Sequence, residues 1–170
     1  MGIGGLAILT IAVGICAQGA DLATGVVLVA TAKSKDPDFA RSAVVLIHYD
    51  SESAMGLMLN KPAGVPISEV LPGAKGKPAV IFGGGPVSIG VRGLVRTESP
   101  PFFRVITNKA ELLRRIASGE PSSTFRIYAG YTGWTTRQLQ SEVARGLWKV
   151  LPADLGTLWQ RAWHHRTELR

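Results

Sequence analysis

Hydrophobic residues in this chain occur in short runs separated by polar turns, which is typical of a protein with many strands. Most runs are rich in β-branched residues or alternate apolar with polar side chains. The predicted strands span 25–32, 42–49, 55–60, 79–87, 90–97, 102–107, 124–131 and 147–151. The run SAVVLIHY at 42–49 is almost continuously apolar, which indicates a strand buried on both faces.

Helical spacing of apolar residues first appears after Asn108. Asn108 is a favourable first cap, and Glu111 lies three residues on, as in a capping box. Gly119 then ends the helix. The pattern predicts a helix between Asn108 and Gly119 with one apolar face.

A second capping box, formed by Thr135 and Gln138, predicts a helix over 135–145 that stops at Gly146. A single helical turn is predicted at 67–71, and a last helix is predicted after Asp154. The residues of this last helix that are expected to face inward are Leu155, Leu158, Trp159 and Ala162.

Strands and helices are mixed without a regular β-α-β alternation, which predicts an α+β fold with a largely antiparallel sheet. A length of 170 residues suits one compact domain. The 20 glycines and 10 prolines are mostly scattered as single residues, so they indicate breaks between short elements.

Two glycine-rich segments are the candidate ligand loops. In FGGGPVSIG, at 82–90, Pro86 has no N–H donor and no helix follows, so a phosphate site is not predicted. In GYTGWTTRQL, at 130–139, a strand runs into a helix whose N–H groups are able to meet an anion. The Thr135 cap satisfies these groups internally, which favours a structural corner over a ligand loop.

At this corner, Gly130 and Gly133 are expected to adopt positive φ or to allow a close backbone approach. Tyr131 and Trp134 are expected to bury their rings and to use their polar tips in hydrogen bonds.

No catalytic constellation is visible in the sequence, so no catalytic residue, cofactor or metal ligand is predicted. His48 is interpreted as a hydrogen-bonded residue at a strand end, and His164 and His165 as solvated residues near the C-terminus. The loop acids are explained by turn chemistry, without the spacing of a calcium loop. These acids are Asp36, Asp38, Asp50 and Glu52.

Residues 1–20 carry no charged side chain. The apolar run at 6–17 has the length of a signal-peptide core and is shorter than the ~20 residues of a membrane span. We interpret 1–20 as a signal peptide or membrane anchor and 21–170 as the domain, which predicts a periplasmic or membrane-anchored protein. The alternative is a cytoplasmic protein whose translation starts near Asp21.

The only cysteine, Cys16, lies in the leading segment, so no disulfide-linked partner is expected for the mature domain. The net charge of +7 is compatible with a solvated basic surface, a protein partner, an anionic surface or nucleic acid. Nucleic acid is a reasonable partner only if the protein is cytoplasmic. No zinc-finger spacing or RNA-binding aromatic motif accompanies the charge.

Several separated motifs together resemble the AlgH/YqgE family, over residues 22–163. They are GVVLVATAKSKDPDFARSAVVLIHYD, GLMLNKP, FGGGPV, RIYAGYTGWTTRQLQSEVARGLWKV and a late LW. The resemblance implies a bifurcated sheet folded into a pseudo-barrel with helices around it. It implies no catalytic residues and no cofactor, although some family members are described as transcriptional regulators. This chain departs from the family at 135–137, where a Gly-Pro-Gly-like segment is common.

Together these observations predict a non-enzymatic binding or interaction protein. The candidate interaction surface consists of Asn60, Lys61, Gly83, Gly84, Gly85, Gly130, Tyr131, Gly133 and Trp134. One alternative is a cytoplasmic transcriptional regulator that contacts nucleic acid. Another is an enzyme with an unrecognised site at the glycine-rich loops.

Overall fold

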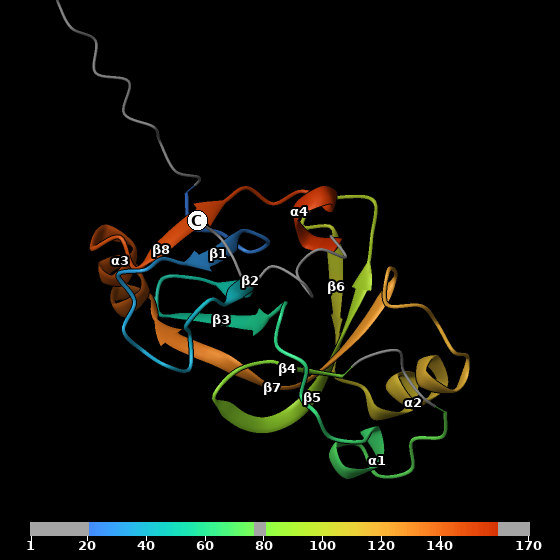
Figure 1. Ribbon diagram of the computed structural model, residues 1–170. Helices are drawn as coiled ribbons and strands as arrows, with labels where there is room; N and C mark the ends of the chain where they lie inside the picture. The colour runs from blue at the N-terminus through green and yellow to red at the C-terminus, as the bar shows by residue number, and fades with distance from the viewer. Residues whose placement is uncertain (1–20, 77–80, 160–170) are drawn as a thin grey trace, which may run out of the picture.

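The computed structural model describes residues 21–76 and 81–159 (Figure 1). The predicted leader at 1–20 with Cys16, positions 79–80 of a predicted strand, and Ala162, His164 and His165 lie outside these residues. Within the described ranges, no helix is long and apolar enough to cross a bilayer.

The described residues form eight strands and four helices. The strands are β1 (Val27–Ala30), β2 (Ala43–Tyr49), β3 (Ser53–Met58), β4 (Ile81–Gly83), β5 (Val87–Arg96), β6 (Phe103–Ile106), β7 (Phe125–Thr135) and β8 (Trp148–Leu151). The helices are α1 (Ile67–Val70), α2 (Lys109–Ala117), α3 (Thr136–Ala144) and α4 (Leu155–Trp159).

The strands join in the order β6-β5-β7-β3-β2-β1-β8, with every pairing on this path antiparallel. β4 lies off the path and pairs with β7 in parallel. The α+β class and the largely antiparallel sheet are therefore confirmed. The sheet is bifurcated because the two halves of β7 belong to different groups of strands (Figure 1).

The prediction that the strand beginning near residue 124 ends at residue 131 is wrong. This strand, β7, continues to Thr135 because residues 132–135 pair with 53–56 of β3. The segment predicted as a corner is therefore mostly strand, and the turn into α3 is confined to Thr135 and Thr136. For the same reason β3 begins at Ser53, two residues earlier than its apolar pattern indicates.

β5 also differs from its prediction, since one long strand replaces the end of 79–87 and the whole of 90–97. Its pairing shifts between Val87, which lies opposite Tyr131, and Val91, which lies opposite Ala129. The intervening residues bulge from the sheet, and the side chain of Ile89 is 72% exposed. Such bulges redirect a strand at the edge of a pairing.

Three apolar clusters fill the fold. One lies inside the curved sheet, where residues from seven strands meet Leu158 and Trp159 of α4. A second lies under α3, around Trp134, Leu139 and Trp148. The third lies under α1 and α2. Burial of these apolar side chains is the main favourable contribution to folding.

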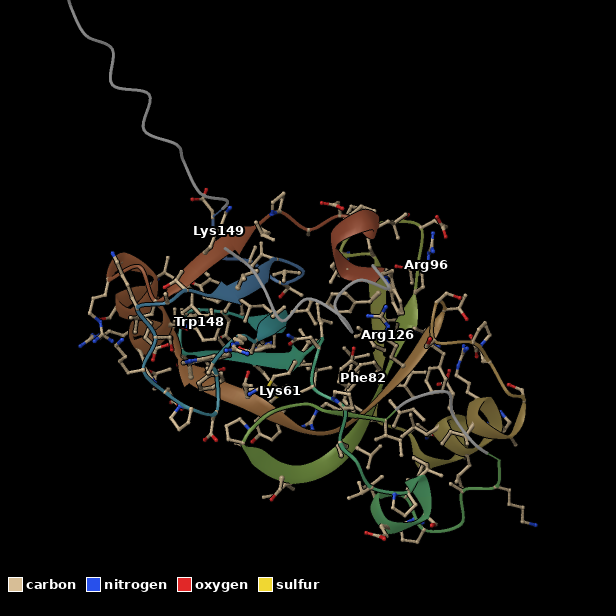
Figure 2. The ribbon with its side chains drawn as sticks, in the orientation of Figure 1. Lys61, Phe82, Arg96, Arg126, Trp148 and Lys149 are labelled. Atoms are coloured by element: carbon tan, nitrogen blue, oxygen red, sulfur yellow. The ribbon has the colours of Figure 1, made fainter. Side chains whose placement is uncertain are left out.

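The helix α4 is held against the inner cluster by a buried arginine, Arg126 (Figure 2). Its Nε donates to the carbonyl oxygen of Ser122 at 3.0 Å, and another guanidinium nitrogen donates to that of Leu158 at 3.1 Å. The guanidinium also lies 4.9 Å from the ring centre of Trp159, whose indole N–H donates to Phe102. These contacts join α4 to β7 and to the loop before β6.

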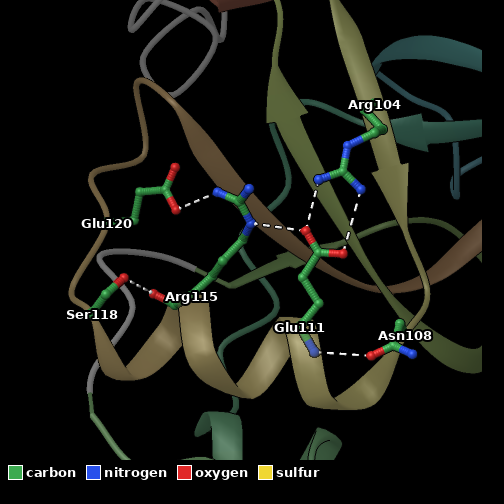
Figure 3. A network of polar contacts seen from close by, with 6 residues as sticks. All are labelled: Arg104, Asn108, Glu111, Arg115, Ser118 and Glu120. Carbon is green, nitrogen blue, oxygen red and sulfur yellow. Dashed lines mark hydrogen bonds and ion pairs between the residues drawn. The ribbon is translucent and has the colours of Figure 1, made fainter.

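Both predicted helix caps are present, but neither is a reciprocal capping box. Asn108 Oδ1 accepts from the N–H of Glu111, yet the Glu111 carboxylate binds Arg104 at 2.7 Å and Arg115 at 3.4 Å instead of turning back (Figure 3). Thr135 Oγ1 likewise accepts from the N–H of Gln138. Two guanidinium nitrogens of Arg104 bind the two carboxylate oxygens of Glu111, and such bidentate pairs between opposite charges are among the strong hydrogen bonds.

The hydrogen bond from Arg104 lowers the pKa of Glu111 below its ordinary value of 4.5. A depressed pKa in the folded state adds stability above pH 4.5 that is lost as the pH falls through the folded value. We predict that Glu111→Gln lowers the free energy of unfolding at neutral pH and that its difference from wild type shrinks below pH 4.5. Urea unfolding across this pH range measures the difference.

Glu98→Gln is the matched control, because the Glu98 side chain is 78% exposed and lies 3.5 Å from Arg96. An exposed ion pair contributes little. A difference between wild type and Glu111→Gln that stays constant from neutral to acid pH contradicts the prediction.

Candidate functional site

Three of the segments singled out in the sequence meet at one place, where β3, β4 and β7 come together. The N–H of Gly83 donates to the carbonyl oxygen of Lys61 at 2.7 Å, and the N–H of Gly84 donates to that of Ala129 at 2.7 Å. The carbonyl oxygen of Gly84 accepts from the N–H of Met58 at 3.0 Å. Main-chain hydrogen bonds therefore bind LNKP, FGGGP and the start of AGYTG into one junction.

Two glycines make this junction possible. A Cβ on Gly84 would overlap the carbonyl oxygen of Gly130, and a Cβ on Gly130 would overlap that of Val87. Gly130 also has a φ of 77°, which L side chains rarely adopt. The expectation of positive φ and close backbone approach is therefore confirmed at Gly130.

The same expectation is wrong at Gly133. This residue is not among those with positive φ, and a Cβ there would meet only the Tyr131 ring, at 3.4 Å. Gly133 pairs with Met55 in the regular ladder between β7 and β3. Its backbone is ordinary strand because the predicted corner does not exist at this position.

A pocket of about 280 Å³ opens beside the junction, and we call it the junction pocket. It is lined by Asp38, Met58, Lys61, Pro62, Ala63, Gly83, Gly85 and Pro86. The Lys61 ammonium donates to the carbonyl oxygen of Asp38, and this contact joins residues 23 positions apart in the chain (Figure 2). Within the described part of the chain, no carboxylate forms an ion pair with Lys61.

Asn60 supports this pocket instead of lining it. Its Oδ1 accepts from the N–H of Ala43 at 3.0 Å, and its Nδ2 donates to the carbonyl oxygen of Arg41 at 2.8 Å. The side-chain amide thus extends the pairing between β2 and β3 by one residue. These two hydrogen bonds fix the direction of the main chain immediately before Lys61.

Tyr131 lies near the junction and packs against the inner cluster. The guanidinium of Arg92 lies 4.6 Å from the centre of its ring, a favourable cation–π distance. Arg92 of β5 therefore lies over the Tyr131 ring. Val87, the first residue of β5, pairs with Tyr131 of β7.

Trp134 does not line the junction pocket, although it shares a core cluster with Met58, which does. It packs with Phe39 and Trp148, at ring-centre distances of 5.7 Å and 5.9 Å. Its indole N–H and that of Trp148 donate to the same carboxylate oxygen of Glu142, at 3.2 Å and 2.8 Å. The predicted buried ring with a hydrogen-bonded tip is confirmed.

His48 and Asp50 form a turn, as expected of a strand-end histidine. The His48 Nε2 and Asp50 Oδ2 atoms are 2.8 Å apart on the surface. The N–H groups of Ser53 and Glu52 bind the Asp50 carboxylate and lower its pKa. Among the described residues, no group of three His, Cys, Asp or Glu side chains is placed to hold a metal ion.

Sequence reasoning missed the contributions of Asp38 and Pro86 to the pocket. Asp38 was explained by a turn, and its N–H does bind Asp36 Oδ1 at 2.9 Å. No local signal places this loop over Lys61. Only the pairing of β2 with β3 brings the two ends together.

The bifurcated, mostly antiparallel sheet with its surrounding helices places this protein in the α+β class. The family model described as AlgH-like matches residues 27–168, so the chain belongs to the AlgH-like family. The resemblance seen in the sequence is confirmed.

Individual relatives agree with this assignment. The chain is 34% identical over 162 residues to a UPF0301 protein of Streptomyces avermitilis, covering 78% of this chain and 77% of the relative. It is 32% identical over 143 residues to a UPF0301 protein of Stutzerimonas stutzeri, covering 75% of each.

Among solved structures, the AlgH protein from Pseudomonas aeruginosa is similar with a TM-score of 0.67 and 28% identity over 84% of each chain. A protein from Corynebacterium diphtheriae shares the fold, with a TM-score of 0.65 and 24% identity over 86% of each chain.

The two glycines of β7 make a matched pair for testing the junction. Gly130→Ala should lower the free energy of unfolding by more than about 2 kcal/mol, because it adds backbone strain and steric overlap. Gly133→Ala should change it by less than about 0.5 kcal/mol. Urea unfolding measures the free energy of unfolding of both variants. An equal decrease at the two positions contradicts the proposed junction.

The shared acceptor at Glu142 gives a second test. Glu142→Ala leaves two mostly buried indole N–H groups without their acceptor, so it should cost about 2 kcal/mol or more and change tryptophan fluorescence. Gln138→Ala removes only an exposed hydrogen bond to Glu142 and should cost less than about 0.5 kcal/mol. A similar decrease in the free energy of unfolding of the two variants counts against a structural role for the Glu142 carboxylate.

Proposed function

We propose that this protein is a non-enzymatic binding protein whose junction pocket takes an acidic side chain of a partner protein. The observation that carries the proposal is the position of Lys61. Lys61 lines the junction pocket, and its ammonium is bound to one main-chain oxygen and to no carboxylate of the described chain. An ammonium has three donors, so it retains capacity for a ligand.

The lining supports binding more than catalysis. It contains no histidine, cysteine, serine, threonine or tyrosine. Lys61 and Asp38 are its only charged side chains, and the Lys61 ammonium is directed to a main-chain oxygen of the Asp38 residue. A positioned nucleophile with an adjacent base, which most acyl- and glycosyl-transfer sites need, is not present among these residues.

The size and chemistry of the pocket favour one side chain over a free metabolite. About 280 Å³ lies just below the 300–1,000 Å³ typical of small-molecule sites. Met58, Pro62 and Pro86 offer apolar surface to the stem of a glutamate, and Lys61 meets its carboxylate. The Asp38 carboxylate is then available to accept a main-chain N–H of the same segment.

The overall charge of +7 supports an acidic partner, because it raises the rate of encounter with negatively charged proteins. The same charge would attract nucleic acid. A binding test distinguishes the two classes of partner. Binding of a protein side chain requires the pocket, whereas binding of a phosphate backbone requires only the surface charge.

The test is an NMR titration of the full chain with the peptide acetyl-Gly-Glu-Gly-amide and its glutamine counterpart. The glutamate peptide should shift resonances of residues 58–63 and 83–86 and bind about fivefold more tightly than the glutamine peptide. Lys61→Gln should abolish this preference. Lys149→Gln, which changes a lysine on β8 outside the pocket, should retain it.

Two outcomes contradict the proposal. One is an equal loss of affinity in the Lys61 and Lys149 variants, which indicates general charge attraction. The other is shifts confined to residues outside the pocket. Displacement of the peptide by double-stranded DNA, with steep salt dependence, would favour the nucleic-acid alternative.

A further inference from the structure

A second and larger pocket lies at the opposite end of the β5 bulge, between α1 and α2. Its volume is about 470 Å³, within the range of sites that hold small molecules. We call it the α1–α2 pocket. It is lined by Glu69, Val70, Leu71, Pro72, Ser88, Gly90, Val91, Thr107, Lys109, Leu112 and Ala129. Figure 1 shows the two helices side by side at this end of the molecule.

The floor of this pocket is apolar. Leu71 and Leu112 are buried members of the third core cluster, and Val70, Val91 and Ala129 pack against that cluster while remaining partly exposed. The opening therefore reaches the hydrophobic core itself. A ligand that covers these side chains would remove apolar surface from water, which is favourable.

The β5 bulge produces this opening. Between Val87 and Val91 the strand leaves its pairing with β7, and Ser88 and Gly90 become pocket lining instead of ladder residues. Gly90 has a φ of 80°, which permits the strand to turn outward and back. The main chain of β5 thus forms one side of the pocket, and α1, the turn after it and the start of α2 form most of the rest.

The rim carries charged and polar side chains that have no hydrogen-bond or ion-pair partner among residues 21–76 and 81–159. The Lys109 ammonium forms no ion pair or hydrogen bond with the described residues, and neither does the Glu69 carboxylate. The hydroxyls of Ser88 and Thr107 likewise have no hydrogen-bond partner within the described ranges. The Lys109 ammonium and the two hydroxyls are each able to donate a hydrogen bond to an anion.

We propose that the α1–α2 pocket binds a small monocarboxylate with an apolar body. The carboxylate would meet Lys109 and the hydroxyls of Thr107 and Ser88, and the hydrocarbon would lie on Val70, Val91 and Leu112. Glu69 would repel a second negative charge, so the site would discriminate against dicarboxylates. This ligand differs from the acidic protein segment proposed for the junction pocket, and either proposal can fail alone.

Three probes with the same eight-carbon chain separate the contributions to binding: octanoate, 1-octanol and octanedioate. In an NMR titration of the full chain, octanoate should shift residues 67–72, 88–91 and 107–112 in a saturable manner. It should bind about tenfold more tightly than either the alcohol or the dianion, because only octanoate satisfies both the rim and the floor.

Variants then locate the site. Lys109→Gln should weaken octanoate binding about tenfold and remove its advantage over octanol, while Lys61→Gln leaves octanoate binding unchanged. Glu69→Gln should reduce the difference in affinity between octanoate and octanedioate. Ser88→Trp, at an exposed bulge position, should block the pocket without removing any rim charge or core side chain.

The proposal is overturned if octanoate causes no saturable shifts at these residues, or if octanol binds as tightly as octanoate. It is also overturned if the Lys109→Gln and Lys149→Gln variants are both folded and lose affinity for octanoate equally. Loss of the glutamate-peptide preference in Lys61→Gln with octanoate binding intact would support two independent sites.

Discussion

The rest of the structure depends on one close approach between main chains, where Gly84 packs against Gly130. Any side chain at either position would overlap a carbonyl oxygen. Because this contact is free of side chains, β7 passes from its pairing with β4 and β5 to its pairing with β3. The bifurcated sheet and the inner apolar cluster both follow from that passage.

Side chains with charged ends then hold the helices to this sheet. Glu142 uses one carboxylate oxygen to bind the indoles of Trp134 and Trp148, which fixes α3 over its cluster. Arg126 binds two main-chain oxygens and the face of Trp159, which fixes α4. Arg126 is a buried cation whose charge is met by carbonyl dipoles and aromatic rings, so its removal would leave those oxygens unpaired.

The lysines that line the two pockets have a different role from these buried groups. Lys61 and Lys109 form no ion pair with a described carboxylate, whereas Arg96, Arg104 and Arg115 each do. Arginine suits fixed, bidentate contacts within the fold, and the flexible ammonium of lysine suits a ligand that arrives and leaves. Arg104 and Arg115 thus act within the fold through Glu111 and Glu120, whereas the ammonium groups of Lys61 and Lys109 remain available to a ligand.

The sequence by itself determined the α+β class, the positions of most strands, the caps at Asn108 and Thr135, and the family. The structural features rest on local periodicity and on hydrogen bonds between residues three positions apart, and the family rests on the resemblance of separate motifs along the chain. Tertiary structure decided that 132–135 is strand, that Trp134 does not line the junction pocket, and that Asp38 lies beside Lys61. Each depends on a partner distant in the chain, such as β3 for the end of β7. Local patterns carry no information about such partners, because strand pairing offers hydrogen bonds that override local turn preferences.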